Sequence, residues 1–152
     1  QKPLRKQNKE DVAEIVREYF LPYSEAFANE VERLRKIHGR VTIVDLHSYP
    51  LLASPYELHK EAQRPNVCIG VDDFHTGQSL VAITNACFKS LGSISINEPF
   101  AGTYVPLMHY QKEPSVQSIM LEIRRDTYSH GNESSSEFAL TAQAIASFID
   151  AL

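Results

Sequence analysis

The sequence predicts an α/β protein, a three-layer fold in which helices flank a mostly parallel or mixed sheet. Three observations indicate this class. Segments with helical periodicity alternate with short apolar runs rich in β-branched residues. The resulting order is helix, strand, long loop, strand, helix, strand, strand, helix. The 152 residues suffice for one domain with a substantial core, and no internal repeat or composition shift divides them, so residues 1–152 are expected to form a single domain.

The first element is a long amphipathic helix over residues 8–38. Its apolar residues recur at steps of three and four, which places them on one face. Asn8 is expected to cap the helix at its start, and Gly39 to end it. Pro22 interrupts the pattern, so the helix either kinks there or divides in two, with Pro22 in the first turn of the second part.

The strands and later helices follow from shorter patterns. Apolar runs at 41–46 and 67–71 are typical of buried strands, and the segments 93–97 and 117–123 predict two more. Residues 48–66 are interpreted as a long loop with one helical turn near 56–60. Helices are expected at 78–91 and from about Ser134, where Ser134 and Glu137 have the spacing of a capping box.

Composition excludes several classes of protein. The net charge is −4 and no run of basic residues occurs, so nucleic acid is not an expected partner. No apolar stretch approaches the ~20 residues that span a bilayer, so no membrane partner is expected either. The two cysteines, Cys68 and Cys87, lie among apolar residues and are expected to be buried thiols, which favours a cytoplasmic location.

His47 is the first candidate for chemistry, because it ends the predicted strand 41–46, and ligands of α/β proteins bind beyond such strand ends. Asp45 lies two residues earlier and therefore on the same face of a strand. One interpretation is a zinc ligand whose imidazole is oriented by a carboxylate. The other is a hydrogen-bonded histidine without a metal. His38, His59 and His130 are expected to be surface or turn residues, whereas His75 and His109 flank predicted strands.

Glu122 is the second candidate, because it lies inside an otherwise apolar strand. A carboxylate there must be paired, hydrogen-bonded or ligating, and burial can raise its pKa into the range of a general base. Arg124 and Arg125 follow after Ile123. Their guanidinium groups either bind an acidic substrate or pair with Glu122 or Asp126. No phosphate loop, dinucleotide fingerprint or nucleophile motif is present.

Four segments carry a resemblance to a known family. They are Asp-Leu-His-Ser-Tyr-Pro at 45–50, Val-Cys-Ile-Gly at 67–70, Asn-Glu-Pro-Phe-Ala-Gly at 97–102 and Leu-Glu-Ile-Arg-Arg-Asp-Thr-Tyr at 121–128. With Tyr-Phe-Leu-Pro-Tyr at 19–23, they resemble the N-formylglutamate amidohydrolases. Each motif is modest alone, but they occur in the same order over most of the chain.

The resemblance implies a zinc-dependent hydrolase with a fold related to the zinc carboxypeptidases. It implies hydrolysis of N-formyl-L-glutamate, a small acidic N-acyl amino acid, to formate and L-glutamate in histidine degradation. By that analogy His47 is a Zn²⁺ ligand and Glu122 the general base. Arg125, with Arg124, would hold the substrate's carboxylates or the oxyanion. Asn97 and His109 lie in segments that would line the substrate pocket.

Two departures from the family pattern leave alternatives open. Family members have a longer N-terminal part that carries further zinc ligands, so this chain is expected to match their middle and C-terminal portion and to bind zinc weakly by itself, unless His75 or His109 serves as an extra ligand. Many members also have Asn where this chain has Arg124. The alternatives are a related zinc amidohydrolase or carboxypeptidase with another N-acyl or peptide substrate, and a non-catalytic binding domain with an incomplete metal site.

Overall fold

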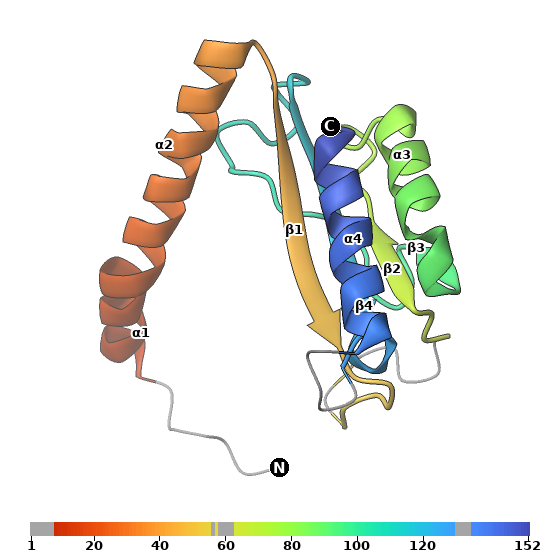
Figure 1. Ribbon diagram of the computed structural model, residues 1–152. Coiled ribbons are helices and arrows are strands. Elements are labelled where there is room, and N and C mark those ends of the chain that lie inside the picture. Colours follow the sequence, from red (N-terminus) through yellow and green to blue (C-terminus); the bar gives the residue numbers. More distant parts are fainter. Residues whose placement is uncertain (1–7, 56, 58–62, 130–134) are drawn as a thin grey trace.

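The structure is built on a four-stranded mixed sheet with the strand order β1-β4-β2-β3. It is a computed structural model that describes residues 8–55, 57, 63–129 and 135–152 (Figure 1). Strands β1 (Val41–Tyr49) and β4 (Val116–Arg124) are parallel, as are β2 (Val67–Gly70) and β3 (Ile94–Ile96). The two pairs meet where β2 runs antiparallel to β4. The predicted α/β class and flanked mixed sheet are confirmed.

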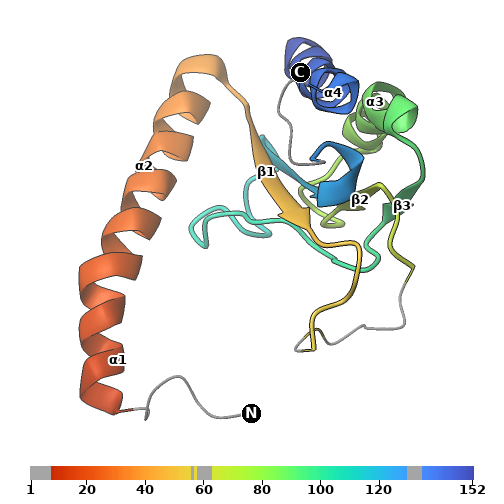
Figure 2. The same cartoon turned by 60° about the horizontal axis from the view of Figure 1, so that its bottom comes forward.

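One face of the sheet is covered by α3 (Gln78–Phe88) and α4 (Ser136–Asp150), which lie side by side in both ribbon views (Figures 1 and 2). A short 3₁₀ turn, Lys89–Leu91, follows α3. Alternate residues of the strands meet these helices and form the main core, because successive side chains of a strand point to opposite faces. Its buried residues are Val67, Ile69, Leu80, Phe88, Leu91, Ile119, Leu121, Ile123, Ala144 and Phe148.

The other face carries the N-terminal helical arm, which consists of α1 (Lys9–Ile15), a π-helical segment (Val16–Phe20) and α2 (Leu21–His38). Figure 2 shows the arm projecting from the β1 side of the sheet. Its attachment is a small cluster in which Val31 of α2 packs with Ile43, Val105 and Val116. Val31 is the arm's one buried residue among those described, so most of the predicted apolar face is exposed.

Pro22 lies in the first turn of α2, as one of the two predicted alternatives has it, and the chain passes into α2 through the π segment. The Leu21 N–H donates to the Val16 carbonyl, five residues back. Proline has no N–H and crowds the preceding turn, and a wider turn relieves that crowding. Gly39 ends α2 in the left-handed region, with φ of 76°.

Other boundaries differ from the predictions by a few residues. β1 continues to Tyr49, because its backbone stays paired with β4 as far as Arg124. The cap of α4 is Ser135, whose hydroxyl accepts from the Phe138 N–H, and not Ser134, which lies outside the described residues. Most of the turn predicted at 56–60, His59 and His130 also lie outside them. In the described helices, none is both long and apolar enough to cross a membrane.

Candidate functional site

The site lies at the end of the sheet where β1 and β4 finish together. The register places His47 of β1 beside Glu122 of β4, and Cys68 of β2 on the other side of Glu122. Asp45 shares their face, because it lies two residues before His47. This is the face opposite α3 and α4. Parallel pairing therefore brings the two sequence candidates, 75 positions apart, into adjacent places on one surface.

His47 and Asp45 form a close pair. The His47 Nε2 lies 2.7 Å from Asp45 Oδ1, and the imidazole side chain is 49% exposed. When Nε2–H donates to the carboxylate, Nδ1 carries the lone pair of the neutral ring. A neighbouring carboxylate orients metal-binding histidines in the same way. The pair is therefore suited to presenting Nδ1 to a metal ion.

Glu122 is half-buried, and its Oε2 has no hydrogen-bond partner within the part of the chain that the structure describes. Burial raises the pKa of the Glu122 carboxyl above its usual value. Electrostatic interactions with His47, Arg125 and Arg64 oppose this rise in the Glu122 pKa, whereas the interaction with Asp45 adds to it. A carboxylate with a raised pKa and a free oxygen has the properties of a general base.

A pocket of about 570 Å³ opens in front of these residues, and we call it the polar pocket because His47, Asn97, Glu98 and Glu122 are among its lining residues. The loop after β3 forms its wall, and Asn97 anchors that loop. Its Oδ1 accepts from the Val71 N–H at 2.9 Å and from the Gly102 N–H at 3.2 Å, while its backbone takes φ of 56°. Among the described residues, the Asn97 amide is engaged through Oδ1, and no hydrogen bond is made by its Nδ2. The lining residues are His47, Asn97, Glu98, Pro99, Phe100, Ala101, Met120 and Glu122.

Gly70 lets this loop close over the sheet. A Cβ at Gly70 would lie 2.1 Å from the Gly102 carbonyl oxygen and 2.5 Å from Met120 Cε. Real Cβ atoms do not approach a backbone oxygen so closely, and glycine is the residue that permits such contact. The glycine of the Val-Cys-Ile-Gly segment thus places the pocket wall.

The two arginines separate in the structure. Arg124 donates to both carboxylate oxygens of Asp126, at 2.7 Å and 3.2 Å, and also to the Arg64 carbonyl. Of the two roles that the sequence allowed for Arg124, the structure therefore shows pairing with Asp126, and the Arg124 guanidinium is occupied by it. Arg125 is exposed, and its charge acts on Glu122. Of the two, Arg125 is the one whose side chain is exposed.

The structure does not bring His75 or His109 to this pocket. Both ring nitrogens of His75 are engaged, with the Val116 carbonyl at 2.7 Å and the Gln111 N–H at 2.8 Å. Val116 begins β4, so His75 lies at the far end of the sheet from His47. His109 is 5% exposed, and its Nε2 lies 3.6 Å from Glu32 of α2. It contributes to the contact between the loop before β4 and the helical arm.

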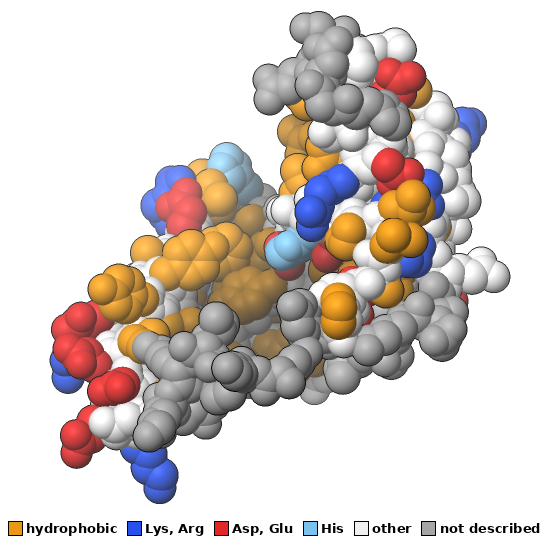
Figure 3. All heavy atoms as spheres, turned by 90° about the horizontal axis from the view of Figure 1, so that it is seen from below, with side chains coloured by type: hydrophobic (Ala, Val, Ile, Leu, Met, Phe, Trp, Pro, Cys, Tyr) orange, Lys and Arg blue, Asp and Glu red, His pale blue; other side chains and the backbone are white. Residues whose placement is uncertain are grey.

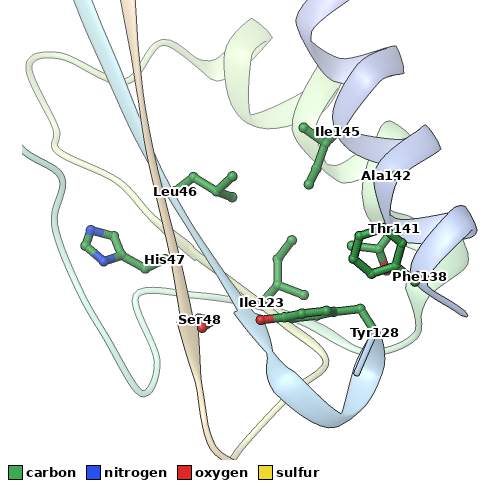
Figure 4. Close-up of a pocket in the computed structure, with 9 residues that line it drawn as sticks. All are labelled: Leu46, His47, Ser48, Ile123, Tyr128, Phe138, Thr141, Ala142 and Ile145. Atoms are coloured by element: carbon green, nitrogen blue, oxygen red, sulfur yellow. The ribbon is translucent and has the colours of Figure 1, made fainter. Parts of the chain in front are cut away.

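A second cavity, of about 340 Å³, lies on the opposite side of β1, against α4. Figure 4 shows Leu46 and Ile145 directed into it, whereas the His47 side chain points away on the other side of the strand. Its lining is mainly apolar. It offers no group for the chemistry of His47 and Glu122, which belongs to the polar pocket.

Seen from the end where β1 and β4 finish, the molecule has a hollow between the helical arm and the sheet (Figure 3). A histidine, acidic and basic side chains gather beside it, and hydrophobic side chains line the arm.

Sequence reasoning missed three residues near the pocket wall: Tyr49, Arg64 and Phe100. The signal available was an aromatic residue before Pro50 and an arginine before Pro65, at the two ends of the predicted long loop.

An α/β sheet whose end presents a histidine–carboxylate pair beside a half-buried glutamate is suited to hydrolysis by acid–base catalysis. The family model for N-formylglutamate amidohydrolase matches residues 1–129, and the chain belongs to this family. The resemblance drawn from the four motifs is thereby confirmed.

The fold is also similar to a solved structure, the N-formylglutamate amidohydrolase from Ralstonia eutropha JMP134, with a TM-score of 0.73 and 22% sequence identity. The likeness covers 97% of this chain and 55% of that one, so the chain spans about half the length of that protein. Among curated proteins, none matches the sequence.

Proposed function

We propose that the chain carries the general base and one metal ligand of a zinc-dependent amidohydrolase that cleaves N-formyl-L-glutamate to formate and L-glutamate. The observation that carries the proposal is the placement of the Asp45–His47 pair beside Glu122 at the mouth of one pocket. Family membership supports the reaction class. In this role the protein would act in histidine degradation in the cytoplasm, where the free thiols Cys68 and Cys87 are stable.

The chain's own residues supply proton transfer and orientation. Glu122 takes a proton from the attacking water and passes it to the leaving amine of glutamate. Asp45 holds the His47 ring so that Nδ1 faces outward. Asn97 Nδ2 and the Arg125 guanidinium supply hydrogen bonds and positive charge for the substrate's carboxylates. His47 would be one of the residues that hold zinc, and a metal held there would supply a water molecule of pKa about 7 and a positive charge for the formyl oxygen.

The fit of this site to zinc is partial. Catalytic zinc takes three protein ligands, with water in the fourth position. His47 offers one nitrogen, but over the described ranges no group of three or more His, Cys, Asp or Glu side chains could hold a metal ion. The ligand set is therefore proposed to be completed by groups that the described residues do not supply, and these residues alone are expected to hold zinc weakly.

A second candidate is a related zinc amidohydrolase or carboxypeptidase that acts on another N-acyl or peptide substrate. The pairing of Arg124 with Asp126 and of Arg64 with Glu57 favours it. Of the arginines described near Glu122, Arg125 is then the exposed one, and N-formylglutamate has two carboxylates. A non-catalytic binding domain is the third candidate, favoured by the incomplete donor set.

A substrate comparison separates these candidates. The complete gene product is assayed with N-formyl-L-glutamate, N-acetyl-L-glutamate, N-formyl-L-leucine and a glutamate-containing dipeptide. We expect the highest kcat/KM for N-formyl-L-glutamate, because the positive charge of Arg125 acts on Glu122 in the pocket and favours an acidic substrate. A higher kcat/KM for any other compound would replace the proposed substrate. Hydrolysis of none of them, with metal bound, would favour the binding domain.

Zinc binding tests the role of His47 without an activity assay. In the metal-stripped gene product, His47→Asn is expected to abolish high-affinity zinc binding measured by calorimetry. Asp45→Asn is expected to weaken it about 10- to 100-fold, as loss of a carboxylate behind a ligating histidine does. His38→Asn, an exposed residue at the end of α2, serves as the control. Unchanged zinc affinity in His47→Asn would refute the ligand assignment.

A further inference from the structure

Arg64 contacts three parts of the chain: Pro50, Glu57 and Phe100 of the pocket wall. Its Nε and Nη2 donate to the Pro50 carbonyl, at 3.1 Å and 2.7 Å, directly after the end of β1. Its Nη1 donates to Glu57 at 2.6 Å, and the arginine side chain is only 10% exposed. The Arg64 guanidinium holds the pKa of the Glu57 carboxyl below its usual value. Arg64 therefore contacts the chain both at Pro50, where it leaves β1, and at Glu57.

The same guanidinium covers two aromatic rings. Its central carbon lies 5.0 Å from the centroid of Tyr49 and 6.0 Å from that of Phe100, and the two rings meet edge to face at 5.3 Å. Tyr49 is buried and donates its hydroxyl hydrogen to the Pro65 carbonyl. Phe100 lines the polar pocket. A cation over aromatic faces attracts them, more strongly where water is excluded. Arg64 therefore supports Phe100, which is part of the pocket wall.

We infer that Arg64 is a positioning residue, which fixes Phe100 of the pocket wall and the buried Tyr49 beside it and does not itself bind the substrate. Arginine has five N–H donors, and the four hydrogen bonds to Pro50 and Glu57 occupy four of them. A two-point contact with a substrate carboxylate needs two free donors. Arg64 therefore differs from Arg125, which is exposed at the same end of the sheet.

The kinetic arm of the test rests on the proposed function. Arg64→Met keeps an unbranched stem but removes the guanidinium. We expect it to lower kcat about 10- to 100-fold, because a wall displaced by an ångström misplaces the substrate. The loss should be equal for N-formyl-L-glutamate and N-formyl-L-glutamine. Arg33→Met, which removes an exposed pair with Glu30 on α2, is the matched control and should leave kcat unchanged.

A spectroscopic arm does not depend on the reaction. The protein has seven phenylalanines, and with 4-fluorophenylalanine the ¹⁹F signal of Phe100 can be assigned by its loss in Phe100→Leu. Arg64→Met should shift or broaden this signal, and Arg33→Met should not. If Arg64→Met does not fold, Glu57→Gln, which removes only the ion pair of Arg64, should still shift the Phe100 signal.

The outcomes separate the alternatives. An unchanged Phe100 signal in both variants would overturn the inference, whatever the substrate of the enzyme is. A rate loss confined to N-formyl-L-glutamate, expressed mainly in KM, would also overturn it and make Arg64 a ligand of the side-chain carboxylate. If none of the formyl compounds is hydrolysed but the signal shifts, the proposed substrate fails and the positioning role stands.

Discussion

Replacing Glu122 by glutamine is expected to lower the kcat of the gene product for N-formyl-L-glutamate about 10²- to 10⁴-fold, the range for loss of a general acid–base group. Glutamine keeps the shape of the side chain but cannot accept the proton of the attacking water. KM should change little, because glutamine fills nearly the same volume in the pocket. The measurement is steady-state kinetics with zinc content determined on the same sample.

The control for this variant is Glu113→Gln. Glu113 precedes β4 and pairs with Arg35 of α2 at 3.4 Å, away from the polar pocket, so kcat should be retained. If Glu122→Gln hydrolyses the substrate at nearly the normal rate while zinc stays bound, Glu122 is not the general base. If kcat fell equally in Glu122→Gln and Glu113→Gln, the cause would be the loss of a negative charge, and not the loss of a proton acceptor at Glu122.

Phe148→Ala is expected to have the largest effect on stability, about 3–5 kcal/mol in the free energy of unfolding, as removal of a buried aromatic ring does. Phe148 of α4 is 0% exposed and meets Phe88 of α3 edge to face at 5.8 Å. Its ring belongs to the core that packs α3 and α4 on the back of β4. Urea unfolding of the gene product measures the change.

Phe138→Ala, on the same helix, is the matched control. The Phe138 side chain is 39% exposed at the edge of the apolar cavity, so its removal leaves no enclosed void. The loss should be well below that of Phe148→Ala, near the ~1 kcal/mol typical of point mutations. Equal losses would mean that α4 is not held to the sheet through Phe148.

Much of the fold was predictable because local patterns carry it. Apolar runs and steps of three and four placed all four strands and the long helices within a few residues. Asp45 and His47 were predicted on one face, because alternation along a strand is a local property. Exposure on α4 was less predictable. Ile149 lies four residues after Ile145 of the core and is nevertheless 51% exposed, because the neighbouring helix, and not the periodicity, decides which part of an apolar face is covered.

The engagement of polar side chains was not predictable in the same way. Arg124 and Arg125 are adjacent in the sequence, but Arg124 pairs with Asp126 and the Arg64 carbonyl, whereas Arg125 is exposed. His109 flanks a strand as His47 does, but it contacts Glu32 of the arm. Arg64 drew no notice in the sequence. Each outcome depends on which donors and acceptors tertiary packing brings within about 3 Å, the range of a hydrogen bond.

By itself, the sequence determined the α/β class, the family and the two principal candidates, His47 and Glu122, because these depend on short patterns and on motifs in a fixed order. Only the tertiary structure decided that these candidates are neighbours. The parallel register of β1 and β4 sets His47 beside Glu122, and the antiparallel course of β2 carries His75 to the opposite end. Strand order and register arise from contacts between distant residues, which no local pattern records.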